Sequence, residues 1–257
     1  MAAIRKRLSI RVVLCFLAIG LFAACGSRRE PASAHVAVAA NFTDAAKEIA
    51  QAFEQKSGNH AILSFGSTGQ LFAQITQDAP FEVFLAADEE TPRKTVDGGF
   101  GQAGSIFTYA VGKLVLFSAT LDLTDGEAVL REGKFEKIAI ANPATAPYGA
   151  AAMEALQSLG LDAKLAGKIV RGNNITQALQ FAETGNAELA FVALSQTIEK
   201  NPKSTWLVPQ PLYSPIRQDA VLLKKGTAND AANSFVSFMK SPDAIKIIEK
   251  YGYAASH

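Results

Sequence analysis

The sequence predicts an α/β protein with two lobes, in which each lobe holds a mostly parallel sheet flanked by helices. Short, almost entirely apolar runs alternate with amphipathic stretches of about 10 to 15 residues, a pattern typical of strands that helices cover on both faces. The pattern occurs twice, separated by a long β-rich segment at 105–119. A chain of 257 residues that is 49% hydrophobic can bury a core in one large or two modest domains.

The first set of alternating elements begins at His35, where the run HVAVAA predicts a strand. Apolar residues that recur on one helical face mark the helices, and glycines mark their ends. In chain order the set contains a strand at 35–40, a helix from Phe42 that ends near Gly58, a strand at 61–66, a helix through Leu71 and Ile75, and a strand at 82–88.

The second set repeats this order after the β-rich segment. It contains a strand at 137–143, a helix at 148–159 ended by Gly160, a strand at 168–173, a helix at 175–184 and a strand at 188–194. A second extended segment at 215–226 and two terminal helices follow it.

The two extended segments predict where the chain crosses between lobes. We expect crossings near 108–116 and 214–222 that act as hinges, a first lobe of residues 35–110 plus 218–257, and a second lobe of residues 111–217. In folds of this kind a ligand binds beyond the carboxyl ends of the strands, so the cleft between the lobes is the expected site.

The N-terminus predicts export. Residues 1–24 combine a basic start with an apolar run of 13 residues, which is too short to span a bilayer and is typical of a signal peptide. The sequence Phe22-Ala23-Ala24-Cys25 resembles a bacterial lipobox with Phe in place of Leu, which favours lipid attachment at Cys25; cleavage after Ala34 is the alternative. We therefore expect a periplasmic protein that touches the membrane only through a lipid anchor.

Charge and cysteine content exclude several classes of protein. The whole chain carries 25 basic and 24 acidic groups, but four of the basic groups lie in the first 24 residues, so the remainder has 25 − 4 = 21 and a net charge of −3. This balance argues against nucleic-acid binding. Because Cys15 lies in the signal, the mature chain has at most one cysteine and no intrachain disulfide. We expect a monomer.

No motif indicates an enzyme, a cofactor or a free metal cation. GFGQAG at 99–104 follows a predicted helix rather than a strand, the reverse of a dinucleotide fingerprint. The three histidines lack metal-ligand spacing. The carboxylates of Asp88, Glu89 and Glu90 suggest acid/base chemistry, but their position before Thr91-Pro92 favours the N-terminal end of a helix.

Four strand-to-helix turns carry small hydrogen-bonding residues, two turns in each predicted lobe. Each turn offers free backbone N–H groups and the positive end of a helix dipole, although Asn, Ser and Thr are also common helix caps. The side-chain donors are neutral, so their natural ligand is a small, fully deprotonated oxyanion. The turns are AANFT (39–43), FGSTGQ (65–70), APYGA (146–150) and GNNITQ (172–177).

At these turns, and over nearly all of residues 35–253, the chain resembles the periplasmic molybdate-binding proteins of ABC importers, which have the two-lobed class II solute-binding fold. The resemblance implies a molybdate site made by Ala40 (backbone), Asn41, Ser67, Thr68, Tyr148 and Ile175 (backbone). Many members have Ser where Asn41 stands, and some have a ligand tyrosine where Ala193 stands; here Tyr148 supplies a phenol instead.

The resemblance implies capture of molybdate, and of tungstate, for delivery to a membrane permease driven by an ATPase. Two alternatives stay open: a carrier for another tetrahedral oxyanion such as sulfate, and a ligand-sensing module of a signalling system.

Overall fold

The computed structural model describes residues 31–254, and these residues contain two five-stranded sheets. The unit that begins at Ala32 contains both sheets, and we call each sheet with its helices a lobe. The predicted signal peptide and the predicted lipid attachment at Cys25 lie outside the described residues.

The first sheet has the strand order β2-β1-β3-β10-β4. Strand β1 pairs in parallel with β2 and β3, whereas β10 runs antiparallel to both β3 and β4. The strands of this sheet are β1 (Ser33–Ala39), β2 (His60–Gly66), β3 (Val83–Leu85), β4 (Phe107–Gly112) and β10 (Ile216–Leu222).

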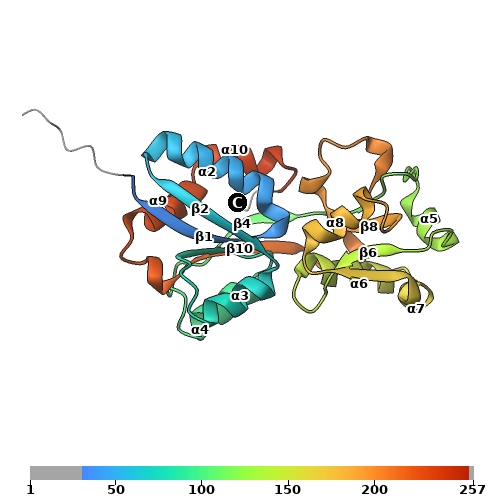
Figure 1. Cartoon of the computed structure of the whole chain (residues 1–257), viewed down its shortest axis with the longest axis horizontal. Helices are drawn as coiled ribbons and strands as arrows, with labels where there is room; N and C mark the ends of the chain where they lie inside the picture. Colours follow the sequence, from blue (N-terminus) through green and yellow to red (C-terminus); the bar gives the residue numbers. More distant parts are fainter. Residues whose placement is uncertain (1–30, 255–257) are drawn as a thin grey trace, which may run out of the picture. The chain divides into compact units, whose positions relative to one another are not determined.

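Successive side chains of a strand point to opposite faces of its sheet, and in the central strands of the first sheet both sets are apolar. Helices therefore cover both faces of this sheet. Val36 and Val38 of β1 pack in one cluster with α2, α9 and α10, and Ala37 packs in another with α3 and α4 (Figure 1). The helices are α2 (Thr43–Ser57), α3 (Thr68–Thr76), α4 (Glu90–Asp97), α9 (Asp230–Met239) and α10 (Pro242–Lys250).

The second sheet has the order β7-β6-β8-β5-β9, with β6 parallel to β7 and β8, and β5 antiparallel to β8 and β9. Its strands are β5 (Leu114–Phe117), β6 (Ile138–Ala141), β7 (Ile169–Gly172), β8 (Leu189–Ala193) and β9 (Thr205–Leu207). Its helices are α5 (Gly126–Glu132), α6 (Pro147–Ser158), α7 (Asp162–Leu165) and α8 (Ile175–Glu183).

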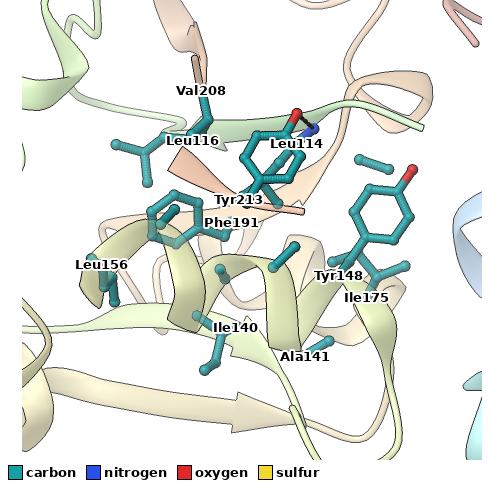
Figure 2. Packing of buried hydrophobic residues seen from close by; sticks show 14 of the residues in the cluster. Leu114, Leu116, Ile140, Ala141, Tyr148, Leu156, Ile175, Phe191, Val208 and Tyr213 are labelled. Atoms are coloured by element: carbon teal, nitrogen blue, oxygen red, sulfur yellow. Dashed lines mark hydrogen bonds between the residues drawn. The ribbon is translucent and has the colours of Figure 1, made fainter. Parts of the chain in front are cut away.

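Short 3₁₀ helices connect several of these elements. They are η1 (Ala40–Phe42), η2 (Ala166–Lys168), η3 (Leu194–Gln196), η4 (Pro202–Ser204), η5 (Gln210–Leu212) and η6 (Lys224–Gly226). Helix α6 lies on one face of the second sheet, where Leu156 packs with Phe191 and Leu116 (Figure 2), and α8 packs in a separate cluster with Val115 and Val192.

The chain passes from the first sheet to the second across a single residue, Lys113, which separates β4 from β5. It returns to the first sheet before β10, after β9 and η5. The predicted long β segment at 105–119 is therefore two strands in two sheets, and these crossing segments supply the antiparallel strands of both.

The predicted fold class is confirmed, and most predicted elements lie within a few residues of the observed ones. Strand β3 is shorter than predicted, because the chain turns towards α4 after Leu85. Sequence reasoning missed strand β9 and helix α5, which carry no strong apolar periodicity. Within residues 31–254, no helix has the length and apolar character needed to cross a membrane.

The first lobe depends on an aromatic contact between two of its covering helices. Phe53 of α2 and Phe235 of α9 are both buried and meet edge to face, with 5.3 Å between ring centroids. Phe235→Ala should lower the free energy of unfolding by about 3 to 5 kcal/mol, because it leaves a cavity in a close-packed core. Chemical denaturation measures this loss. Leu207→Ala, at a side chain that is 52% exposed, is the control and should change little; an equal effect of both changes would contradict this role for Phe235.

Candidate ligand-binding site

A small cavity lies where the four predicted turns meet. Its volume of about 10 Å³ corresponds to room for the centre of about one water-sized sphere. All six residues that the sequence predicted for the site line it. The full lining is Ala39, Ala40, Asn41, Ser67, Thr68, Ala87, Ala146, Pro147, Tyr148 and Ile175, and none of these described residues carries a charge.

Three hydroxyl groups at the cavity have protons available for a bound acceptor. Ser67 Oγ is buried and has no hydrogen-bond partner among residues 31–254. Thr68 Oγ1 accepts from the Ala87 N–H at 3.0 Å, and Tyr148 Oη accepts from Gln218 Nε2 at 3.2 Å. A hydroxyl that accepts a bond still has its own proton to donate. The arrangement therefore offers donors to a ligand.

Tyr148 lies at the margin of the apolar core of the second lobe, with its hydroxyl directed away from the packed side chains (Figure 2). Burial raises the pKa of the Tyr148 phenol well above its ordinary value, and the nearby Tyr253 and Tyr109 raise it further. The phenol therefore stays protonated at neutral pH and acts as a hydrogen-bond donor rather than as a negative charge.

Backbone N–H groups complete the set of donors. Ala40 begins η1, and Ile175 begins α8. The first N–H groups of a helix have no partner within it, and the helix dipole makes this end favourable for an anion. Asn174 caps α8 by accepting from the Gln177 N–H at 3.0 Å, two residues beyond Ile175. The N–H of Ile175 itself is not used by this cap.

The side-chain amide of Asn41 is used within the protein. Its Nδ2 donates to Gln218 Oε1 at 2.9 Å and to Tyr253 Oη at 3.0 Å. Asn41 therefore lines the cavity while its two amide protons hold neighbouring side chains, which sequence reasoning did not foresee. Its own backbone carbonyl accepts from Ser195 Oγ at 2.9 Å.

A buried polar network surrounds the cavity, and sequence reasoning missed its members. Gln218 accepts from Asn41 and from Tyr109, and Tyr253 accepts from Asn41. Ser195, in the second lobe, accepts from Tyr253. One weak signal was present: β10 holds three consecutive polar residues, Arg217, Gln218 and Asp219, between apolar neighbours. The tyrosines had no such signal, because an isolated tyrosine in a strand or tail is ordinary.

The two lobes touch directly around the cavity. The Gly69 N–H of α3 donates to the Thr145 carbonyl of the second lobe at 2.9 Å, and Thr176 Oγ1 donates to the Ala40 carbonyl at 3.4 Å. A Cβ at Gly69 would lie 3.1 Å from Thr145 Cα, so glycine permits this close approach. Helices of both lobes thus enclose the cavity.

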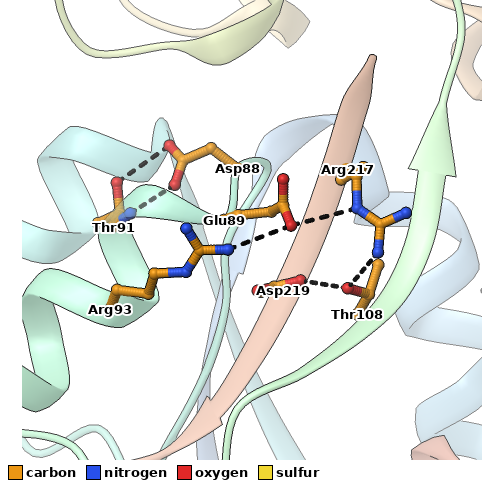
Figure 3. A network of polar contacts seen from close by, with 7 residues as sticks. All are labelled: Asp88, Glu89, Thr91, Arg93, Thr108, Arg217 and Asp219. Carbon is orange, nitrogen blue, oxygen red and sulfur yellow. Dashed lines mark hydrogen bonds and ion pairs between the residues drawn. The ribbon is translucent and has the colours of Figure 1, made fainter.

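A larger cavity of about 530 Å³ adjoins the small one and shares Ala87, Ala146 and Pro147 with it. We call it the vestibule. Its two arginines share one carboxylate (Figure 3): Glu89 Oε1 accepts from Arg93 at 3.3 Å and from Arg217 at 3.2 Å. The arginines nearest the site therefore have a carboxylate partner already.

The carboxylates that suggested acid/base chemistry have structural partners. Asp88 accepts from the Thr91 N–H at 2.7 Å and from the Thr91 hydroxyl at 3.0 Å, at the start of α4 (Figure 3). Burial raises the pKa of Asp88 above its ordinary value, partly opposed by these two bonds. Within residues 31–254, no group of three or more His, Cys, Asp or Glu side chains is placed to hold a metal ion.

Comparison with known proteins identifies the family. Residues 34–254 match the family model described as bacterial extracellular solute-binding protein. The chain belongs to this family. Because the family consists of solute-binding proteins and the similar proteins are of the same kind, the chain is a binding protein and not an enzyme.

Similar members of the family include two curated molybdate-binding proteins named ModA. The protein of Rhodobacter capsulatus is 53% identical over 217 residues, covering 84% of this chain and 86% of that protein. The protein of Azotobacter vinelandii is 51% identical over 250 residues, covering 95% and 98%. A solved structure of the periplasmic molybdate-binding protein of Azotobacter vinelandii superposes with a TM-score of 0.83, covering 87% of this chain and all of that one at 41% identity.

The carboxylate of Asp88 should make the stability of the protein depend on pH. Because burial raises the pKa of folded Asp88 above its unfolded value, its contribution to stability is present at low pH and is lost as the pH rises through the folded pKa. Asp88→Asn keeps an acceptor for the Thr91 N–H and removes the charge. The melting temperature at neutral pH should rise or stay the same, and any gain should shrink towards about pH 4.

Glu90→Gln is the matched control for this change. The ion pair with Lys94 lowers the pKa of Glu90, so loss of its charge should not stabilise the protein. If Asp88→Asn lowered the melting temperature at neutral pH but not in acid, the ionised carboxylate of Asp88 would stabilise the fold, which would contradict this prediction.

Proposed function

We propose that this protein binds molybdate, and tungstate in the same cavity, outside the inner membrane and delivers it to an ABC importer made of a permease and its ATPase. One observation carries the proposal: three protonated hydroxyls and several helix N-termini converge on a small cavity whose lining, among residues 31–254, holds no charged side chain. The relatives that are 51 to 53% identical bear the name molybdate-binding protein, which supports the same ligand here.

The proposed ligands are the hydroxyls of Ser67, Thr68 and Tyr148 together with backbone N–H groups at Ala40, Asn41 and Ile175. Each hydrogen bond to a charged group contributes about 1.5 to 3 kcal/mol. Six such bonds exceed the roughly 8 kcal/mol that a micromolar dissociation constant requires. The surplus is available to close the lobes.

The donor set favours an anion without protons. A hydrogen phosphate ion brings a proton that needs an acceptor, and the described lining residues contain no carboxylate. Sulfate has the same charge and shape as molybdate but shorter bonds to oxygen. Cavity size is therefore the proposed basis on which the protein distinguishes these two dianions.

Delivery follows from the two-lobed architecture. We propose hinges near 108–116 and 214–222, between lobes of residues 35–110 plus 218–257 and 111–217, so that the lobes close on the ligand and the closed form meets the permease. The proposed mature protein is a monomer, without residues 1–24 and held at the periplasmic face of the membrane by lipid on Cys25.

Calorimetry with molybdate, tungstate, sulfate and phosphate tests the proposed ligand. Molybdate and tungstate should bind at least about 100-fold more tightly than sulfate, which corresponds to about 2.7 kcal/mol. Phosphate should bind weakly or not at all. Sulfate binding as tight as molybdate binding would overturn the assignment and leave a carrier for a smaller oxyanion.

Tyr148→Phe tests the proposed phenol donor. It removes one hydrogen bond to a charged ligand and should weaken molybdate binding by about 1 to 3 kcal/mol. Tyr213→Phe is the matched control, because Tyr213 is a buried tyrosine of the same core whose hydroxyl accepts from the Leu114 N–H at 3.1 Å and does not line the cavity. Equal affinity of wild type and Tyr148→Phe would remove Tyr148 from the site.

A further inference from the structure

Gln218 is a fully buried amide beside the cavity that does not line it. It lies in β10, the strand that follows the second crossing, between Arg217 and Asp219. A buried polar side chain requires hydrogen-bond partners, and Gln218 has them at both ends of its amide.

The two ends of the Gln218 amide bond to residues of different lobes. Its Oε1 accepts from Asn41 Nδ2 at 2.9 Å and from Tyr109 Oη at 3.0 Å, both in the first lobe. Its Nε2 donates to Tyr148 Oη, in the second lobe, at 3.2 Å. The Asn41 amide, together with a Tyr109 proton that is shared with the Ala86 carbonyl at 2.9 Å, holds the oxygen end and so turns the nitrogen end towards Tyr148.

We propose that Gln218 is a positioning residue for the anion site, which directs the phenolic proton of Tyr148 into the cavity. This role rests on the proposed function of Tyr148 as a ligand donor. A phenol has one proton, and Nε2 can donate but cannot accept. While Nε2 occupies the acceptor side of Tyr148 Oη, the Tyr148 proton must point to another acceptor. Tyr253 Oη is a neutral acceptor within its reach, and a bound oxyanion is a charged and therefore stronger one.

Gly112, at the first crossing, leaves space for the contact between Gln218 and Tyr148. A Cβ at Gly112 would lie 2.0 Å from Tyr148 Oη and 2.7 Å from Gln218 Nε2. Any side chain at this position would displace the two groups that meet there. The last residue of β4 is therefore small where the amide and the phenol make their contact.

A double-mutant cycle tests the positioning role, with molybdate affinity measured by calorimetry. Gln218→Leu should weaken binding about tenfold in the wild-type background, and less than about twofold in the Tyr148→Phe background, because its effect passes through the phenol. Gln210→Leu is the control: this exposed glutamine donates to the Tyr213 carbonyl and should not change affinity. Circular dichroism checks that each variant is folded.

Gln218→Glu provides a second measurement that a purely structural role would not alter. The protonated acid can donate to Tyr148 as the amide does, whereas the ionised carboxylate can only accept and would draw the phenolic proton away from the ligand. Affinity in this variant should fall as the pH rises from about 6 to 9, while the wild type shows no such change. The fall should be smaller in the Tyr148→Phe background, where only charge repulsion remains.

The outcomes separate this role from the proposed function. The positioning role would be overturned if Gln218→Leu weakened molybdate binding equally in both backgrounds, or in neither. It would also be overturned if the affinity of Gln218→Glu depended equally on pH in both backgrounds. Molybdate binding itself would still stand in each case. Wild-type protein that binds no molybdate would overturn the proposed function, and the same cycle is then measured with sulfate. Binding of neither anion would overturn both.

Discussion

The site depends on the direction of hydrogen-bond donors, because none of the described residues that line its cavity carries a charge. A cation attracts an anion from any direction, whereas a hydroxyl attracts it only along its O–H bond. A neutral site must therefore hold each proton inward. Here Thr68 and Tyr148 each accept a bond from inside the protein, which leaves their protons for the cavity. The buried network around the site follows from this requirement.

The same requirement explains why both lobes touch at the cavity. Donors that act over a hydrogen-bond length must come close to the ligand from all sides, and helix ends from one lobe reach only part of it. Gly69 and Gly112 lie where a side chain would keep the lobes or their side chains apart. At the first crossing a single residue, Lys113, separates the strands of the two lobes.

The vestibule shows how charge is kept from the neutral site. Its arginines share Glu89, and Asp88 is tied to the first turn of α4. These groups line the larger cavity but not the smaller one. The described lining of the small cavity therefore offers oriented dipoles rather than a counter-ion.

The sequence by itself determined the alternation of strands and helices and the four turns, because hydrophobic periodicity and capping residues are local signals. It indicated the six lining residues through motif resemblance. Only the tertiary structure decided that the amide of Asn41 bonds to Gln218 and Tyr253, and that Ser195 reaches across from the other lobe. These partners lie 177, 212 and 154 positions from Asn41, and hydrogen bonds between such distant residues have no local pattern in the sequence.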